Sequence, residues 1–290
     1  MSAATTPPTL LKIAVPNKGS LSDSAIQMLK DAGYRTRADA KELVLFDEAN
    51  GVEFYYLRPR DIAVYVGEGT LDLGITGRDM LADSGAEATE IMGLGFGRSR
   101  FRFAAPGGSE WTTQNLEGKR IATSYPGLVG AYLAERGVSA RLIKLDGAVE
   151  SSIRLGVADA IADVVETGTT LRKAGLELFG EPICISEGIL IERAGLEHTP
   201  QIEQFLRRLS GVLVARDYVL VDYDVSDEFL DAACALTPGL EGPTVSDLAK
   251  PGWSAVRSLV PQADAQRLMD ELWDVGARAI LITELSACRL

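Results

Sequence analysis

The sequence predicts an α/β fold with two lobes and a separate C-terminal module. Short apolar runs alternate with amphipathic helical segments through most of the chain, which is typical of α/β sheets with parallel pairing. The alternation occurs twice, once before and once after residue 99. The last part of the chain instead follows the order β-α-β-β-α-β. A chain of 290 residues suits two or three domains of ordinary size.

Strand–loop–helix units make up the expected first lobe. Four short apolar runs predict strands: residues 10–15, 42–46, 52–57 and 71–76. The second and third of these strands form a pair across the DEANG turn. Each helix begins where a run breaks: LSDSAIQMLKDAG follows the PNKGS loop, a short helix begins at Pro59, and GRDMLADSG starts another.

The expected second lobe repeats strand, turn and helix. Strands are predicted at residues 99–106, 119–126, 140–147 and 158–165, and helical segments follow the last three. Residues 183–195 (ICISEGILIERAG) supply extended segments that are expected to cross back to the first lobe, and residues 198–214 predict a helix.

In the C-terminal module, strands are predicted at residues 217–226 and 253–261 and in the terminal ARAILITELSACRL. DEFLDAACAL and DAQRLMDELWDVG predict helices, and the Gly- and Pro-rich TPGLEGPTVSDL is expected to hold a short strand. This order is ferredoxin-like, and such units often act as regulatory modules. The predicted domains are catalytic lobe I (1–102 and 186–214), catalytic lobe II (103–185) and a regulatory domain (215–290).

The charge balance limits the possible partners. With 41 Asp and Glu against 29 Lys and Arg, the formal net charge is −12. This argues against nucleic-acid binding, which needs a basic face. A small anionic substrate would need a site built locally from backbone N–H groups, a few cations and Mg²⁺. The N-terminal MSAATTPPTL is neither basic nor apolar, and no run of 18 apolar residues occurs. We therefore expect neither a signal peptide nor a membrane span.

Cysteine and histidine are scarce. Cys184, Cys234 and Cys288 are far apart and lack CxxC spacing. This disfavours a disulfide framework or a zinc site and favours a cytoplasmic protein. The single histidine, His198, lies in a polar segment before a helix, where a surface position is favoured over a catalytic one. Ser–His–Asp and Cys–His chemistry are therefore not expected.

A hydroxyl-rich turn follows the predicted strand in DAIADVVETGTTL (159–171). Gly168 lets the backbone approach a ligand, and the next helix begins with free N–H groups. Three threonines add hydroxyl donors: Thr167, Thr169 and Thr170. Together these groups would hold a phosphate without a cation. From the residues alone, a plain helix N-cap remains the alternative.

Acidic residues precede this turn, and they would repel a phosphate unless a neutral sugar diol or Mg²⁺ lies beside them. A carboxylate accepts two hydrogen bonds from a ribose diol. Asp163, near the end of the strand, is better placed for this than Asp159 or Glu166. Glu150, at the start of the preceding helix, is the next candidate.

The 22 residues ESSIRLGVADAIADVVETGTTL (150–171) resemble the signature of the ATP phosphoribosyltransferase family, the first enzymes of histidine biosynthesis. The segments AVPNKGSL, YYLRPRDIAVYV, LDLGITGRD and TPGLEGPT agree with the same family. The resemblance covers nearly the whole chain. Its C-terminal module makes the chain similar to the long form, which carries its own regulatory domain.

The resemblance implies that ATP is coupled to phosphoribosyl pyrophosphate: N1 of adenine attacks C1 of the ribose, and pyrophosphate leaves with Mg²⁺. It implies a two-lobed region similar to periplasmic binding proteins, with the site in the cleft, and an ACT-like C-terminal domain. It also implies homo-oligomers, in which dimers assemble into hexamers. The oxocarbenium-like sugar and departing pyrophosphate need positioning and electrostatics rather than a strong base.

The same resemblance implies roles for the loop and two cations. The 5′-phosphate is expected on residues 167–170, and the ribose hydroxyls on Asp163 and Glu150. Lys18, in PNKGS, is expected to reach the pyrophosphate or the triphosphate, and Arg58, in LRPRD, is a second candidate cation. From the residues alone, an exposed lysine and a surface ion pair account for these two positions equally well.

Nucleotide contacts are expected from two further residues. Asp79 follows a strand, where ligand sites of α/β proteins lie, although a helix N-cap would also place an aspartate there. Tyr125 is expected to stack on adenine, with a half-buried structural tyrosine as the alternative. Many relatives read Lys-Gly-Arg-Leu where this chain has Ser20, so a cation is missing. Either Ser20 serves as a neutral donor or cap, or another arginine compensates.

The resemblance also implies inhibition by L-histidine bound between C-terminal domains. Asp224 would pair with the amino or imidazole nitrogen of that ligand. Leu240 and Thr244 lie on the Gly- and Pro-rich loop whose backbone would take the carboxylate, and Ala279 would be a small wall residue. Without the family, GLEGPT is only a turn.

Two other classes of protein compete with this interpretation. A two-lobed solute-binding or sensor protein predicts a signal peptide or a DNA-binding segment, and neither is visible in the sequence. It also leaves residues 163–170 without a purpose. A catalytically inactive subunit, retained for regulation or assembly, is disfavoured by the intact loop.

Overall fold

The computed structural model describes residues 10–108, 110–165 and 168–289. The chain divides into two compact units. The N-terminal unit comprises Met1–Gln27 and Arg35–Thr199, and the C-terminal unit comprises Met28–Tyr34 and Pro200–Leu290. The helix that starts at Pro200 is grouped with the C-terminal unit, and the predicted domain bounds, with a boundary at 215, stay predictions.

The first sheet of the N-terminal unit has six strands in the order β2-β3-β1-β4-β11-β5. Their bounds are β1 (Leu11–Pro16), β2 (Val44–Asp47), β3 (Val52–Leu57), β4 (Leu73–Gly77), β5 (Ala88–Gly93) and β11 (Gly188–Arg193). β1 pairs in parallel with β3 and β4, whereas β2, β11 and β5 pair antiparallel. The sheet is therefore mixed: it contains the parallel pairing that the alternation predicted and the strand pair predicted across the DEANG turn.

Helices α1 (Ser20–Asp31), α2 (Pro59–Gly67) and α3 (Arg78–Ser84) follow β1, β3 and β4. α2 begins at a proline, whose missing N–H costs nothing at a helix start. Its apolar side chains, Ile62 and Val66 among them, pack on Ala14 and Ile191 of the sheet. The three connections place the loops after β1, β3 and β4 at one edge of the sheet, where ligand sites of α/β folds lie.

The second sheet has five strands in the order β10-β6-β9-β7-β8. Their bounds are β6 (Ser99–Pro106), β7 (Arg120–Thr123), β8 (Arg141–Lys144), β9 (Ala160–Val165) and β10 (Leu176–Ser186). α4 (Pro126–Glu135) packs in one apolar cluster with this sheet, and α6 (Thr169–Lys173) in another. Residues 114–116 form a 3₁₀ turn, and α5 (Ser151–Arg154) is only one turn long. The predicted strands and helices of both lobes are confirmed.

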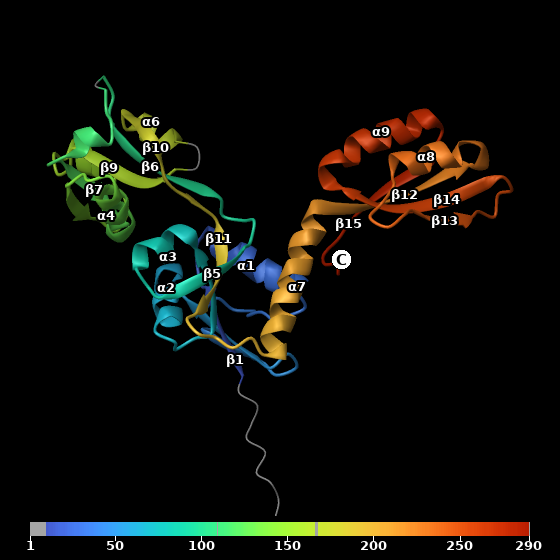
Figure 1. The fold of residues 1–290 in the computed structure, drawn as a ribbon, viewed down its shortest axis with the longest axis horizontal. Helices are drawn as coiled ribbons and strands as arrows, with labels where there is room; N and C mark the ends of the chain where they lie inside the picture. Colours follow the sequence, from blue (N-terminus) through green and yellow to red (C-terminus); the bar gives the residue numbers. More distant parts are fainter. Residues whose placement is uncertain (1–9, 109, 166–167, 290) are drawn as a thin grey trace, which may run out of the picture. The chain divides into compact units, whose positions relative to one another are not determined.

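Two chain segments connect the sheets. Residues 94–98 join β5 to β6, and Glu187 joins β10 to β11. β6 and β10 pair antiparallel and run side by side from the second sheet (Figure 1). The Gly188 N–H donates to Phe96 O at 2.7 Å, and Leu94 N–H donates to Gly188 O at 2.8 Å, so the two connecting segments are bonded to each other. The predicted return of residues 183–195 to the first lobe is confirmed.

A second contact between the lobes involves helices α2, α3 and α4. The Asp83 Oδ1 accepts the N–H groups of Gly127 and Leu128, at 2.8 and 3.1 Å, at the start of α4. Its Oδ2 accepts a bond of 3.0 Å from Arg60, which also donates to Ser124 O at 2.7 Å. A Cβ on Gly127 would lie 2.2 Å from Asp83 O, so only glycine fits this approach.

The C-terminal unit contains a four-stranded antiparallel sheet in the order β13-β14-β12-β15. After α7 (Pro200–Asp217), its elements are β12 (Tyr218–Ser226), α8 (Leu230–Leu236), β13 (Thr244–Asp247), β14 (Trp253–Pro261), α9 (Ala265–Val275) and β15 (Arg278–Glu284). Single 3₁₀ turns precede α8 and α9. The predicted β-α-β-β-α-β order is therefore confirmed. The helices form one core with alternate residues of the strands, such as Val221 and Val256.

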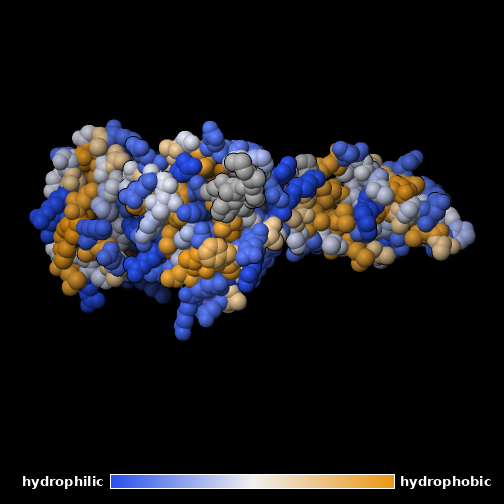
Figure 2. Space-filling model, turned by 90° about the horizontal axis from the view of Figure 1, so that it is seen from below, coloured by the Kyte–Doolittle hydropathy of each residue, from blue (hydrophilic) through white to orange (hydrophobic). Residues whose placement is uncertain are grey.

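The surface of the described chain is mixed in polarity. Hydrophilic and apolar residues are interspersed over the face in Figure 2. Among the helices of residues 10–108, 110–165 and 168–289, none is both long and apolar enough to cross a membrane.

Candidate active site

Among the described residues, three adjoining cavities lie in the N-terminal unit. We call them the loop cavity (about 290 Å³), the central cavity (about 170 Å³) and the arginine cavity (about 650 Å³). Val164 lines both the loop and the central cavity, and Val165 lines both the loop and the arginine cavity. Ser99 and Ser186 line both the central and the arginine cavity. Because they share lining residues, the three cavities are adjacent, and we call them together the cleft.

The loop cavity is formed where β9 turns into α6. It is lined by Glu150, Asp163, Val164, Val165, Gly168, Thr169, Thr170 and Leu171. Gly168 has a φ of +68°, a left-handed conformation that glycine adopts without strain, and it precedes the first turn of α6. Thr169 and Thr170 open that helix, so the predicted phosphate-loop residues share one cavity. The predicted Thr167 lies outside the described residues.

Two carboxylates face the same cavity. Asp163 lies on β9 opposite Arg102, two residues before the strand ends. Its Oδ1 accepts the Val164 N–H at 2.8 Å. Burial raises the pKa of Asp163 above its ordinary value, the Val164 N–H opposes this, and the nearby charge of Glu150 adds to it. Glu150 precedes α5, and its side chain forms no cap hydrogen bond to that helix.

Asp159 has a different role from Asp163. Its carboxylate accepts bonds from the Arg120 guanidinium at 2.7 and 3.1 Å and from the Arg120 backbone N–H at 2.9 Å. These bonds lower the pKa of Asp159 to about 2. Asp159 therefore ties β9 to β7 and does not line the cleft, which agrees with the preference for Asp163.

The central cavity contains Asp79, which is 5% exposed. The Ser186 hydroxyl donates to Asp79 Oδ1 at 2.8 Å, and the Met80 N–H donates to the same oxygen at 3.0 Å. Ser186 belongs to β10, so a strand of the second sheet fixes a carboxylate of the first lobe. Ser20 lines this cavity as well and brings no charge to it.

Tyr125 also lines the central cavity, but the residue is only 7% exposed. The Arg60 guanidinium lies over the ring at 4.4 Å, and Phe101 meets it edge-on at 5.0 Å. Burial raises the pKa of the Tyr125 phenol, and the charge of Asp79 adds to this. Adenine stacking by Tyr125 stays a prediction, and a base on the face that Arg60 covers would have to displace that guanidinium.

Lys18 and Arg58 are exposed and do not line these three cavities. They follow the paired strands β1 and β3, whose last residues Pro16 and Leu57 lie opposite each other. Both cations therefore lie at the ligand-binding edge of the first sheet without a fixed position in the cleft. His198 lies beside Glu192, with 2.6 Å between Nε2 and Oε2, outside the cleft.

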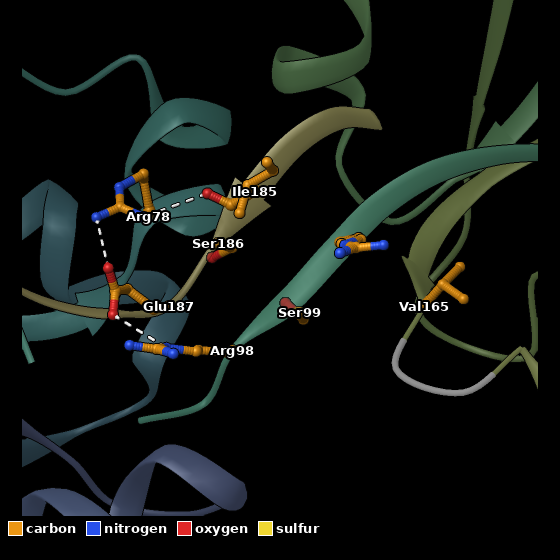
Figure 3. A pocket seen from close by; sticks show the side chains of 8 residues that line it. Arg78, Arg98, Ser99, Val165, Ile185, Ser186 and Glu187 are labelled. Atoms are coloured by element: carbon orange, nitrogen blue, oxygen red, sulfur yellow. Dashed lines mark hydrogen bonds and ion pairs between the residues drawn. The ribbon is translucent and has the colours of Figure 1, made fainter. Parts of the chain in front are cut away.

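The arginine cavity contains residues that the sequence analysis did not single out. It is lined by Arg78, Arg98, Ser99, Arg100, Val165, Ile185, Ser186 and Glu187. Figure 3 shows Glu187 between Arg78 and Arg98, at 3.1 and 3.9 Å. Arg78 also forms a two-pronged pair with Glu90, and this pair is the main cause that raises the pKa of Arg78. The sequence did contain a pattern that could have found them: GRSRFRF (97–103) has an arginine at every second position, just before and within the strand predicted at 99–106.

In the C-terminal unit, the predicted regulatory residues fall into two groups. Leu240 and Thr244 line a cavity of about 610 Å³ with Arg257. Asp224 lies on β12 opposite Arg278, beside Ala279, at a register shift between β12 and β15. Ala279 has a φ of +50°, which is uncommon for a residue other than glycine. One chain therefore does not bring the four residues into one cavity.

Comparison with known proteins identifies the family. A family model described as "ATP phosphoribosyltransferase" matches residues 58–211, and one described as "HisG, C-terminal domain" matches residues 215–287. The chain belongs to the ATP phosphoribosyltransferase family. The sequence-based family prediction, including the prediction of an enzyme, is confirmed.

Full-length relatives agree with this placement. An ATP phosphoribosyltransferase of Arthrobacter sp. (strain FB24) is 60% identical over 286 residues, covering 97% of this chain and 100% of the relative. The ATP phosphoribosyltransferase of Streptomyces coelicolor is 60% identical over 285 residues, with the same coverage. Among solved structures, an ATP phosphoribosyl transferase (HisG:HisZ) complex from Thermotoga maritima is similar with a TM-score of 0.61 and 28% identity. That match covers 69% of this chain and 97% of the other.

Proposed function

We propose that this ATP phosphoribosyltransferase family member transfers the phosphoribosyl group of phosphoribosyl pyrophosphate to N1 of ATP. The products are phosphoribosyl-ATP and pyrophosphate, and the reaction is the first step of L-histidine biosynthesis. The observation that carries the proposal is the loop cavity, in which Gly168, Thr169 and Thr170 share a space with the carboxylates of Asp163 and Glu150.

Two sets of groups in the loop cavity would bind two different parts of the donor substrate. Free N–H groups at the start of α6 and the hydroxyls of Thr169 and Thr170 would bind the 5′-phosphate. Asp163 and Glu150, which line the same cavity, would accept hydrogen bonds from the ribose hydroxyls. Because this holds the ribose at both ends, C1 is fixed for attack by adenine N1.

The transfer requires stabilisation of positive charge near C1 of the ribose and does not require a strong base. Positive charge develops on the ribose as the bond to pyrophosphate breaks, and the carboxylates of Asp163 and Glu150 are of the sign that stabilises it. Adenine N1 attacks with its own lone pair, so no side chain has to remove a proton before attack. The absence of a histidine among the residues that line the cleft agrees with this.

The donor set fits a Mg²⁺ ion that arrives with the substrate. The described residues hold no group of three or more His, Cys, Asp or Glu side chains suited to a metal ion. Mg²⁺ is commonly held by one or two carboxylates together with substrate phosphates, and Asp163 and Glu150 offer such carboxylates. When bound, Mg²⁺ would neutralise charge on the departing pyrophosphate.

The proposal extends to architecture and regulation. The two lobes are those of a fold similar to periplasmic binding proteins, and the C-terminal unit is a ferredoxin-like, ACT-like regulatory domain. L-Histidine binds there and inhibits the enzyme, with contacts to Asp224, Leu240, Thr244 and Ala279. The separation of these residues into two groups agrees with a ligand bound between domains of neighbouring subunits. The enzyme is a cytoplasmic homo-oligomer that forms dimers and hexamers.

One assay tests the reaction and its regulation together. The purified protein is mixed with ATP, phosphoribosyl pyrophosphate, Mg²⁺ and a pyrophosphatase, and the ultraviolet change of N1-alkylated adenine is followed with and without L-histidine. A signal that L-histidine suppresses supports both parts of the proposal. A signal that L-histidine does not change supports the transferase activity and refutes the regulatory role. No signal from folded protein favours an inactive subunit or a sensor.

A further inference from the structure

The arginine cavity carries positive charge that the protein does not neutralise. Arg78 is satisfied, because Glu90 pairs with it at 2.7 and 2.9 Å and Glu187 at 3.1 Å. Among the residues that the structure describes, Arg98 pairs only with Glu187, at 3.9 Å from its Nε, and its side chain is 80% exposed. Within residues 10–108, 110–165 and 168–289, the guanidinium of Arg100 forms no ion pair. Two of the three arginines are therefore available to an anion.

A cluster of arginines is unexpected in so acidic a chain. Because the net charge is −12, carboxylates outnumber cations, and most surface cations have carboxylates available for ion pairs. Three arginines but only one carboxylate, that of Glu187, line the arginine cavity. The local potential there is therefore positive and attracts small anions despite the overall charge. The simplest alternative is that Arg98 and Arg100 are solvated surface residues.

The position of Arg100 relates the cavity to the proposed reaction. Arg100 lies on β6 directly opposite Val165, the last residue of β9. Directly opposite residues of neighbouring antiparallel strands have Cβ atoms about 5 Å apart. Val165 is also the wall between the arginine cavity and the loop cavity. A ligand whose ribose lies by Asp163 would therefore extend toward the arginines within the length of a phosphate group or two.

We propose that the arginine cavity binds the condensed phosphate group of a substrate, with Arg100 and Arg98 as its ligands. The chemical class is a diphosphate or triphosphate chain, which comes from phosphoribosyl pyrophosphate or from ATP. Guanidinium groups suit this class because their planar N–H pairs match two phosphate oxygens at once. The assignment of these substrates rests on the proposed function. Arg98 and Arg100 take over the role of the cation that Ser20 does not supply.

Glu187 sets how the site is held before the ligand arrives. Its Oε1 pairs with Arg78, and its Oε2 accepts the Gly95 N–H at 3.2 Å and lies 3.9 Å from Arg98. The long distance to Arg98 leaves that side chain easy to recruit, whereas Arg78 stays fixed by three charge-assisted hydrogen bonds to Glu90. Arg78 is therefore the rigid wall, and Arg98 and Arg100 are the adaptable ligands.

The test compares Arg100→Gln, Arg98→Gln and a control, Arg141→Gln, which removes the same charge from an exposed residue of β8 outside the cleft. Isothermal titration calorimetry on the full chain measures Mg²⁺-pyrophosphate, ATP and ribose 5-phosphate separately. We expect Arg100→Gln to weaken pyrophosphate binding roughly 10-fold, as for loss of a charge-assisted hydrogen bond at a partly exposed site. Arg98→Gln has a smaller effect, Arg141→Gln has none, and ribose 5-phosphate affinity is unchanged.

The outcomes separate this proposal from the proposed function. If Arg100→Gln weakens ATP but not pyrophosphate, the site is confirmed with ATP as the source of the chain. If Arg100→Gln and Arg98→Gln bind both ligands like the wild type, or if Arg141→Gln weakens binding as much as they do, the site is refuted even when transferase activity persists. If the wild type binds pyrophosphate through Arg100 but has no transferase activity, the site stands and the proposed function fails.

Discussion

The contact of Asp83 with α4 predicts a measurable energy between the lobes. One carboxylate oxygen accepts the N–H groups of Gly127 and Leu128, which the helix itself leaves unsatisfied. The other oxygen pairs with Arg60. A residue of α3 thus serves as the cap of a helix in the other lobe. Asp83→Ala removes both interactions without adding bulk.

The magnitude follows from the two parts. Loss of a helix cap costs about 1 kcal/mol, within a range of about 0.5–2 kcal/mol. The side chain of Arg60 is 42% exposed and that of Asp83 is 10% exposed, so their ion pair contributes no more than about 1 kcal/mol. Arg60 keeps its bond to Ser124 O and its contact with the ring of Tyr125. We expect Asp83→Ala to lower the free energy of unfolding by about 2 kcal/mol.

The assay is urea unfolding followed by the fluorescence of Trp111, which packs against Phe179 of the second sheet, in a background with Trp253→Phe and Trp273→Phe. Asp83→Asn retains an oxygen that caps the helix but loses the charge, so it should cost less than half as much as Asp83→Ala. A loss below about 0.3 kcal/mol for Asp83→Ala, or equal losses for both variants, would refute the capping argument.

Four further changes test the site and the fold. Asp163→Asn should lower turnover roughly 100-fold in the coupled assay. It should also raise the free energy of unfolding at neutral pH, because burial raises the pKa of Asp163 and makes its ionised form costly in the folded state. This gain in stability should vanish below pH 3.8, the ordinary pKa of an aspartate. Gly168→Ala should cost about 1 kcal/mol from its φ of +68° and raise the KM for phosphoribosyl pyrophosphate. Asp159→Asn should lose at most about 1 kcal/mol above pH 4 in urea titrations, and the difference should disappear as the pH falls through about 2. Asp224→Ala should keep activity but raise the L-histidine concentration needed for half inhibition; unchanged inhibition moves the regulatory site elsewhere.

Much of the fold could be predicted because its signals are local. Apolar runs and helical periodicity are properties of neighbouring residues, and they located most strands and helices, including the whole C-terminal sheet. β5 was missed because its residues are only partly buried in the pairing that the structure shows, so ATEIMG lacks an apolar pattern. The first half of β10 was missed because LELFGEP contains Gly180 and an irregularity in its pairing.

The site likewise contains residues that could be predicted from local sequence and contacts that could not. Gly168, Thr169, Thr170 and Asp163 are close in sequence, so a single strand–turn–helix brings them together. The pairing of Asp79 with Ser186 and the contact of Asp83 with the start of α4 join residues that are far apart in sequence. No local pattern encodes such contacts, because they depend on how two separately formed sheets meet.

The distribution of charge along the cleft supports one direction for the substrate. Carboxylates of Asp163 and Glu150 lie on the loop-cavity side of Val165, and guanidinium groups of Arg98 and Arg100 lie on the other side. When a glycosidic bond breaks, positive charge grows on the ribose and negative charge grows on the departing diphosphate. A ribose among carboxylates and a diphosphate among arginines are stabilised at the same time, whereas the reverse orientation opposes both changes. Under the proposed function, the placement of Val165 between the two sets would therefore order the ligand before any catalytic group acts on it.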